Sequence, residues 1–385
     1  MSLLLSTIMA GVYVHIPFCK SRCIYCDFFS TTSLPLREKY VEMLCHEIKI
    51  RSQGLSAEER RIETIYLGGG TPSQLSMEQL RRIFDAVFDC FQVNEEAEIT
   101  MEVNPDDVDA AFLQEMQSLP VNRLSFGIQT FNDERLRFIR RRHTAQQAIN
   151  VVHACQAAGF GNISVDLMFG FPKETIADWE QDIEMALSLG VQHISAYSLM
   201  YEEGTALTRM LQAGEIEEID EELSLQMFRM LVERLKKAGF EHYEISNFAL
   251  PGKRSRHNSS YWHGIPYYGF GAGAHSYDGN RRTWNVEDLH LYIKGVETAQ
   301  LATEGETLTQ EQKYDECVMV GLRTCEGVDL DAIQKEFGRE SLAYLLENAQ
   351  PHLDGGKLCI EQNRIHLTED GIYTSNDIIS DLMRV

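Results

Sequence analysis

The sequence lacks a long hydrophobic run and an excess of basic residues. No apolar stretch approaches the roughly 20 residues that a membrane-spanning helix needs, so we expect no transmembrane segment. The 35 Lys and Arg residues are outweighed by 58 Asp and Glu residues, which gives a formal charge of −23. Because a nucleic-acid partner needs a basic protein face, this balance argues against nucleic acid as the main partner.

A complete set of disulfide partners and a secretory signal are also missing. The nine cysteines are an odd number, so they cannot all be paired. Residues 1–10 are apolar but contain no Lys or Arg, which a secretory signal would carry. We expect them to be a leader that is partly foreign to the natural chain, with Met9 as the native start. The expected location is the cytoplasm, with reduced thiols.

Residues 11–250 alternate short β-like runs with amphipathic helical stretches. Consecutive βα units form parallel sheets with right-handed crossovers. Unusual residues follow nearly every run, which favours a partial (β/α)6 TIM-like barrel over the alternative, an open doubly wound sheet. The predicted class is therefore α/β. The β-like runs, rich in Ile, Val, Tyr or Phe, are 12–16, 62–67, 98–103, 122–128, 162–169 and 193–199.

The remaining sequence divides into two parts. Residues 251–305 are rich in Gly, Tyr, His, Asn and Arg and show little periodicity, so we expect a loop-rich extension. A helical pattern returns in residues 306–385 and ends in a hairpin-like stretch, which predicts a small, winged-helix-like α+β domain. This domain has no basic stripe, so we favour packing or partner contact over DNA binding as its role.

Three cysteines crowd together directly after the first β-like run. The spacing is Cys19-x-x-x-Cys23-x-x-Cys26, and three thiolates on one loop can converge on one metal centre. A structural zinc site needs a fourth ligand, for which His15 and Asp27 are the candidates. A 4Fe-4S cluster accepts three thiolates and leaves one iron open. We favour the cluster over zinc and over three buried thiols without a metal.

A glycine-rich turn with Gly69, Gly70 and Thr71 follows the second run. Glycines allow the backbone to approach a ligand closely. The turn is not a phosphate loop, because no Gly-Lys-Ser/Thr follows it. Polar residues at or near the ends of later runs complete a pocket suited to a zwitterionic nucleoside. These residues are Glu102, Gln129, Arg141 and Asp166.

The cysteine spacing resembles the signature of the radical S-adenosylmethionine (radical SAM) superfamily. The motifs HIPFC, YLGGGTPS, EVNP, LSFGIQTF and DLMFGFP, in this order, resemble the oxygen-independent coproporphyrinogen III oxidase family over roughly residues 11–381. The resemblance implies a radical SAM barrel, a HemN-type C-terminal domain, and a cluster whose open iron chelates S-adenosylmethionine. The residues that it implies in holding the cluster and S-adenosylmethionine are Tyr13, Cys19, Cys23, Tyr25, Cys26, Gly69, Gly70, Thr71, Glu102, Gln129, Arg141 and Asp166.

The family contains oxidases of porphyrin biosynthesis and heme chaperones. The oxidase signature extends to a fourth cysteine two residues after the third, where this chain has Phe28. The chaperones carry a His-Asn-x-x-Tyr-Trp pattern, which residues 257–262 match. A neutral imidazole such as that of His257 is a good ligand for heme iron. Tyr261 and Trp262 offer flat apolar faces to a porphyrin.

We therefore predict a heme chaperone that binds heme through His257 and passes it to acceptor proteins. Its predicted cofactors are the 4Fe-4S cluster, S-adenosylmethionine and heme. We assign no catalytic residue, and we leave open both enzymatic activity and a homodimer. The alternatives are the oxidase itself and a radical enzyme that acts on a different substrate.

Overall fold

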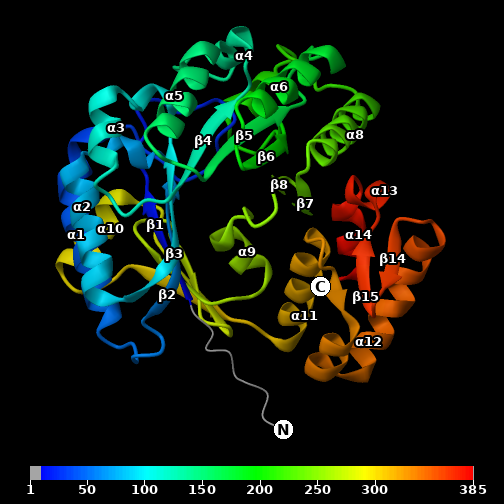
Figure 1. The fold of residues 1–385 in the computed structure, drawn as a ribbon. Coiled ribbons are helices and arrows are strands. Elements are labelled where there is room, and N and C mark those ends of the chain that lie inside the picture. The colour runs from blue at the N-terminus through cyan, green and yellow to red at the C-terminus, as the bar shows by residue number, and fades with distance from the viewer. Residues whose placement is uncertain (1–9, 385) are drawn as a thin grey trace.

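A twelve-stranded sheet forms the centre of the larger part of the chain (Figure 1). The computed structural model describes residues 10–384, so the expected leader lies, except for Ala10, outside the described residues. Parallel strands in chain order form the middle of the sheet: β1 (Ala10–Ile16), β2 (Arg61–Gly69), β3 (Gln92–Val103), β4 (Arg123–Gln129), β5 (Ile163–Phe169) and β6 (His193–Ser198). They overlap the six predicted runs, although β3 begins at Gln92, six residues before the predicted run 98–103. β1 pairs with β2 and β9, and β6 pairs with β5 and β8, so the sheet stays open as a partial barrel.

Helices cover the outer face of this sheet, where buried apolar residues of both layers form the main core (Figure 1). Several begin with a capping box, in which a Ser or Thr side chain and the residue three positions later satisfy each other's backbone N–H groups. The helices up to residue 237 are α1 (Arg37–Ser52), α2 (Met77–Cys90), α3 (Ala110–Met116), α4 (Asp133–Phe138), α5 (Ala145–Ala157), α6 (Ile176–Ser188), α7 (Ala206–Gln212) and α8 (Glu221–Lys237). Short 3-10 helices span Leu34–Leu36, Pro72–Gln74 and Pro105–Asp107.

Short strands extend the sheet at both ends. Beside β6 lie β8 (Asn247–Ala249) and β7 (Glu241–Glu244). Beside β1 lie β9 (Tyr267–Phe270), β10 (His275–Tyr277), β11 (Arg281–Asn285) and β12 (Thr303–Thr307). Residues 251–305, which show little periodicity in the sequence, thus contain β9, β10, β11 and the start of β12, together with α9 (Arg256–Trp262) and α10 (Leu289–Glu297). These strands are too short for an alternating pattern to be visible in the sequence.

The last part of the chain has a hydrophobic core of its own, which includes Tyr314, Ile333 and Ile365. A small antiparallel sheet, in the order β13-β15-β14, packs with helices in the predicted α+β arrangement. Its elements are α11 (Gln310–Arg323), β13 (Val328–Asp329), α12 (Leu330–Asp354), β14 (Leu358–Glu361), β15 (Arg364–Leu367), α13 (Glu369–Ile372) and α14 (Ser375–Leu382). Across residues 10–384, every helix is too short or too polar to cross a membrane.

The inner face of the parallel sheet is polar. Residues of one parity, such as Val12 and Val14, pack into the core beneath the outer helices. Residues of the other parity therefore point to the inner face, because side chains alternate along a strand. Thr64, Tyr66 and Glu102 lie on this face, and α9 packs against β2 there. The fold thus brings the 257–262 motif to the same interior as the ends of the parallel strands.

Candidate functional site

The three crowded cysteines lie half-buried on the loop that follows β1. The Cys19 amide donates to the carbonyl oxygen of Thr31 at 2.9 Å, which closes the base of the loop. Ile24 fixes its tip, because the amide of Leu207 donates to the Ile24 carbonyl at 2.9 Å and the Ile24 side chain is buried in a small apolar cluster. The loop is therefore held in shape by contacts that do not involve the thiols.

The thiols lie close enough to influence one another. Burial raises the pKa of Cys19, and the neighbouring Cys23 raises it further. Burial raises the pKa of Cys26 to about 11, with added contributions from Cys23 and Cys19. Such thiols stay protonated at neutral pH unless a metal centre compensates the thiolate charge. Three sheltered, mutually close thiols fit an iron–sulfur cluster with three protein ligands.

The alternative of a single zinc ion finds less support. Within residues 10–384, no three Cys, His, Asp or Glu side chains converge on one position for a metal ion. Three thiolates that each bind a different iron of a cluster need not converge in this way. His15, a candidate fourth zinc ligand, has Nδ1 3.0 Å from the Tyr13 hydroxyl and Nε2 2.9 Å from the Phe29 carbonyl oxygen.

The glycine-rich turn lies directly against the start of the cysteine loop. A Cβ on Gly70 would lie 2.8 Å from the Ile16 carbonyl oxygen, and one on Gly69 would overlap the His15 ring. Gly69 also has a φ of 105°, which favours glycine. Thr71 follows, with its hydroxyl 3.5 Å from the Cys19 sulfur. These glycines are therefore needed for the close approach of β2 to the end of β1.

Two carboxylates stand at or near the ends of β3 and β5. Glu102 accepts hydrogen bonds from the Tyr66 hydroxyl at 2.7 Å and from the Gly69 amide at 3.1 Å. Burial, together with the charge of Asp166, raises the pKa of Glu102 to about 7. Burial raises the pKa of Asp166 to about 6. An ammonium group placed beside these carboxylates would draw both into the charged form.

Arg141 is directed into the same region. Its Nη2 donates to Asn104 Oδ1 at 2.8 Å and to the Gly127 carbonyl, and its Nη1 lies 3.8 Å from the Cys23 sulfur. The flanking arginines differ, because Arg140 is exposed and Arg142 pairs with Asp106 at 2.5 Å. The sequence analysis assigned no role to Asn104. Its position directly after a parallel strand could have indicated that it belongs to the site.

The other predicted cofactor residues lie around these groups. Gln129 is buried at the end of β4 with a φ of 72°, a left-handed conformation that is rare outside glycine. Tyr25 is half-buried, with Cys23 and Arg141 among the groups that influence its hydroxyl. The Tyr13 ring stacks with that of Tyr66, with centroids 6.2 Å apart. All predicted cluster and cofactor residues outside α9 thus gather at or near the carboxyl ends of β1 to β5.

His257 is buried beneath this region, with 1% of its surface exposed. Its Nδ1 lies 2.8 Å from the Thr64 hydroxyl, and its Nε2 lies 2.8 Å from the Tyr261 hydroxyl. Burial, followed by the charge of Arg123, lowers the pKa of His257 to about 3, so the imidazole is neutral. The ring stacks on Tyr66 at 5.2 Å. Both ring nitrogens therefore have hydrogen-bond partners within the protein.

Tyr261 and Trp262 line a cleft of about 720 Å³ between α9 and the C-terminal helices α11 and α12. The Trp262 indole N–H is buried and has no hydrogen-bond partner among the described residues. The Arg323 guanidinium lies 5.0 Å from the centre of its ring. Among the other residues that line the cleft are His263, Tyr267, Tyr277, Arg282, Lys313, Cys317, Met319 and Arg364, and the acidic residues Glu316, Glu326, Asp329 and Glu336 line it as well.

A smaller cavity of about 320 Å³ connects the cysteine loop with Tyr261. Tyr13, His15 and His275 line it together with Phe28, which is 65% exposed. Phe28 occupies the position of the fourth cysteine in the oxidase signature. Its phenyl ring presents an apolar surface there and cannot supply a thiolate.

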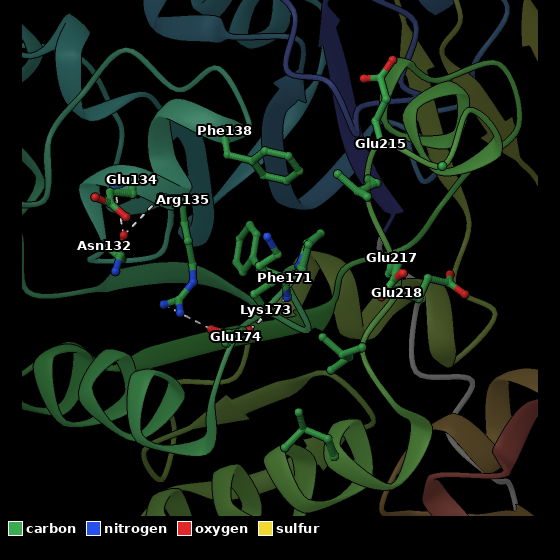
Figure 2. A pocket seen from close by; sticks show the side chains of 15 residues that line it. Asn132, Glu134, Arg135, Phe138, Phe171, Lys173, Glu174, Glu215, Glu217 and Glu218 are labelled. Carbon is green, nitrogen blue, oxygen red and sulfur yellow. Dashed lines mark hydrogen bonds and ion pairs between the residues drawn. The ribbon is translucent and has the colours of Figure 1, made fainter.

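Another cavity, of about 820 Å³, is lined by none of the predicted site residues (Figure 2). Glu174 projects beside Arg135 there, and their charged groups lie 3.6 Å apart. The other carboxylate oxygen of Glu174 accepts from the amides of Gly170 at 2.6 Å and Phe171 at 3.0 Å. This carboxylate therefore holds the turn after β5, which is a structural role.

Comparison with known proteins identifies the family. A sequence profile of the Radical SAM superfamily matches residues 13–186, and one of the HemN C-terminal domain matches residues 308–374. The heme chaperone HemW of Lactococcus lactis subsp. lactis (strain IL1403) is 34% identical, over 97% of this chain and 97% of that protein. The heme chaperone HemW of Bacillus subtilis (strain 168) is 36% identical, over 96% and 98%. The chain belongs to the HemW family.

The fold of this HemW family member matches that of a solved relative. Coproporphyrinogen III oxidase (HemN) from Escherichia coli superposes with a TM-score of 0.85 at 22% identity, over 99% of this chain and 91% of that one. At this identity the match shows the shared fold alone. The predicted membership in the heme-chaperone branch of the coproporphyrinogen oxidase-like family is confirmed. Radical SAM membership implies a 4Fe-4S cluster and S-adenosylmethionine as cofactors.

Proposed function

We propose that this protein is a cytoplasmic heme chaperone, which binds heme at α9 and transfers it to acceptor proteins. The aromatic cleft beside α9 carries the proposal, because Tyr261 and Trp262 of the family motif line it. Its volume of about 720 Å³ falls within the usual range for small-molecule sites. The names of the HemW relatives support heme as the ligand.

In this proposal the porphyrin lies against the aromatic side chains of the cleft. Lys313 lines the cleft, where its ammonium group donates to the neutral amide oxygen of Asn280 at 2.6 Å, and it is suited to a heme propionate. The cations just before the motif are less suited. Arg254 already pairs with Glu241 and Glu326, and Arg256 pairs with Glu63.

The sequence pattern indicates His257 as an iron ligand, and we propose that it can take this role only in a rearranged form of α9 that differs from the form in this structure. The Nε2 of His257 must leave the Tyr261 hydroxyl before it can bind iron. Such a step would move Tyr261, which borders both the large cleft and the small cavity beside the cysteine loop. Heme binding and the state of the cluster loop would then be coupled.

For the cofactors, we propose that Cys19, Cys23 and Cys26 hold the cluster. When bound, the cluster supplies an open iron that chelates the amino and carboxylate groups of S-adenosylmethionine. Arg141 would pair with the carboxylate group, and Glu102 with the ammonium group. The remaining predicted contacts are Tyr13, Tyr25, Gly69, Gly70, Thr71, Gln129 and Asp166.

An anaerobic comparison on cluster-reconstituted protein tests the proposal. One arm titrates hemin, and the other supplies coproporphyrinogen III, S-adenosylmethionine and a reductant. We expect hemin binding in the first arm and no protoporphyrinogen in the second, because Phe28 replaces the oxidase cysteine. Robust product formation would overturn the chaperone proposal in favour of the oxidase.

Two variants test the assigned ligands. Cys23→Ala should abolish the visible absorption of the cluster, while Cys359→Ala, which changes a cysteine on the distant β14, should keep it. A wild-type spectrum in Cys23→Ala would contradict the cluster assignment. Tight heme binding that survives His257→Ala would remove His257 as the iron ligand.

A further inference from the structure

The residue that directly follows the 257–262 motif has the geometry of an iron ligand. His263 is exposed at the C-terminal end of α9 and lines the aromatic cleft. Its Nδ1 lies 2.7 Å from the Ser259 carbonyl oxygen. A carbonyl can only accept, so Nδ1 carries a proton, and in the neutral ring the lone pair is then on Nε2. Histidines that bind metals use this arrangement, with one ring nitrogen oriented by a hydrogen bond and the other on the metal.

Other side chains of the cleft are weaker candidates. Burial raises the pKa of the Cys317 thiol to about 11, with further contributions from Glu336 and Asp329, so iron would have to displace a proton before this thiol could bind it. Met319 offers a thioether, which binds heme iron mainly beside a stronger ligand. Nε2 of His263 has no hydrogen-bond partner among residues 10–384, whereas Nε2 of His257 bonds to Tyr261.

We propose that Nε2 of His263 is the axial ligand that binds heme iron in the form described by this structure. The porphyrin would then lie in the cleft with Trp262 and Tyr267 beside it. His257 acts in this form as a positioning residue, which ties α9 to β2 through Thr64 and orients Tyr261. This inference rests on the proposed function, since it assigns the ligand for the same heme.

Hemin titrations of the full chain, followed by absorption and electron paramagnetic resonance, test the assignment. We expect His263→Ala to weaken hemin binding at least tenfold and to change the spin state of the ferric iron. Added imidazole should restore the wild-type spectrum, which a purely structural effect would not allow. His153→Ala, which changes an exposed histidine on α5, should behave as wild type.

A second comparison separates His263 from His257. We expect His257→Gln to retain the ligand-field spectrum of the wild type, even if its affinity falls because α9 is less firmly held. A wild-type spectrum in His263→Ala, together with a lost one in His257→Gln, would overturn the assignment to His263. Absence of hemin binding in the wild type would instead overturn the proposed function itself.

Discussion

The carboxylate of Glu102 is held near its titration point at neutral pH. Its ordinary pKa of 4.5 rises to about 7, chiefly by burial. The native state therefore holds this proton more tightly than the unfolded chain does. The protonated Glu102 carboxyl therefore stabilises the native state fully below about pH 4.5, and this stabilisation is lost as the pH rises through about 7. A cationic ligand beside Glu102 would offset the cost of burying the charged carboxylate, because it favours the charged form.

We predict that Glu102→Gln removes this dependence. Relative to wild type, the free energy of unfolding of the cofactor-free variant should increase between about pH 4.5 and 8, by on the order of 2 kcal/mol. Urea unfolding across this pH range measures the difference. Glu59→Gln is the control, because hydrogen bonds from Ser56 lower the pKa of Glu59 and the same gain is not expected. A pH-independent difference for Glu102→Gln would contradict the raised pKa.

Some residues of the candidate site could be predicted from the sequence, and others could not. The cysteine spacing predicted the cluster loop, because the ligands are close along the chain. The burial of His257 could not be predicted, since it depends on Thr64 and Glu98, which lie far away in sequence. His263 was missed because it falls one residue outside the motif. Its available signal was a second histidine, beside Trp262 at the end of a short helix.

At the scale of elements, the end of β2 and the start of the cysteine loop form one unit. The Gly70 amide donates to the Ile16 carbonyl at 2.8 Å, and a Cβ on Gly70 would also lie 2.8 Å from the Pro17 carbonyl carbon. Backbone atoms cannot move away as a flexible side chain could. A side chain at this position must therefore displace the loop that carries Cys19.

We predict that Gly70→Ala lowers the iron content and cluster absorption after reconstitution at least severalfold, while the protein stays folded. Iron analysis and circular dichroism measure the two effects. Gly54→Ala is the matched control, because a Cβ on Gly54 meets nothing within 4 Å. Full cluster loading in Gly70→Ala would show that the loop tolerates the displacement.

Elements were predictable where they are long and regular. The six parallel strands alternate with amphipathic helices, and the repetition itself indicates the fold class. The short strands β9 to β12 gave no such signal. Their residues are held by pairing to strands already in place, and β9 adds parallel to β1 although most of the barrel separates them in sequence.

At the scale of the whole molecule, the formal charge of −23 acts on any anionic ligand that approaches. Hemin carries two propionates, so the protein field should slow its association at low ionic strength. Salt shortens the Debye length from about 10 Å at 0.1 M to about 3 Å at 1 M, which weakens this repulsion. The local cation Lys313 acts only over the last part of the approach.

We predict that the association rate of hemin rises severalfold with salt over this range, as measured by stopped-flow absorption. The dimethyl ester of hemin lacks the propionate charges and should show no such rise. A rate that falls with salt would instead show that cations in the cleft dominate the encounter.

The strand β12 has a further consequence for the stability of the protein in solution. It ends the sheet order among the described residues, and all its residues are exposed, including Glu304 and Glu306. An open strand edge is a template on which another chain can add and start aggregation. A second copy of β12 pairing here would bring like charges together. Its acidic side chains thus act as gatekeepers that favour solubility and disfavour oligomers assembled through this edge.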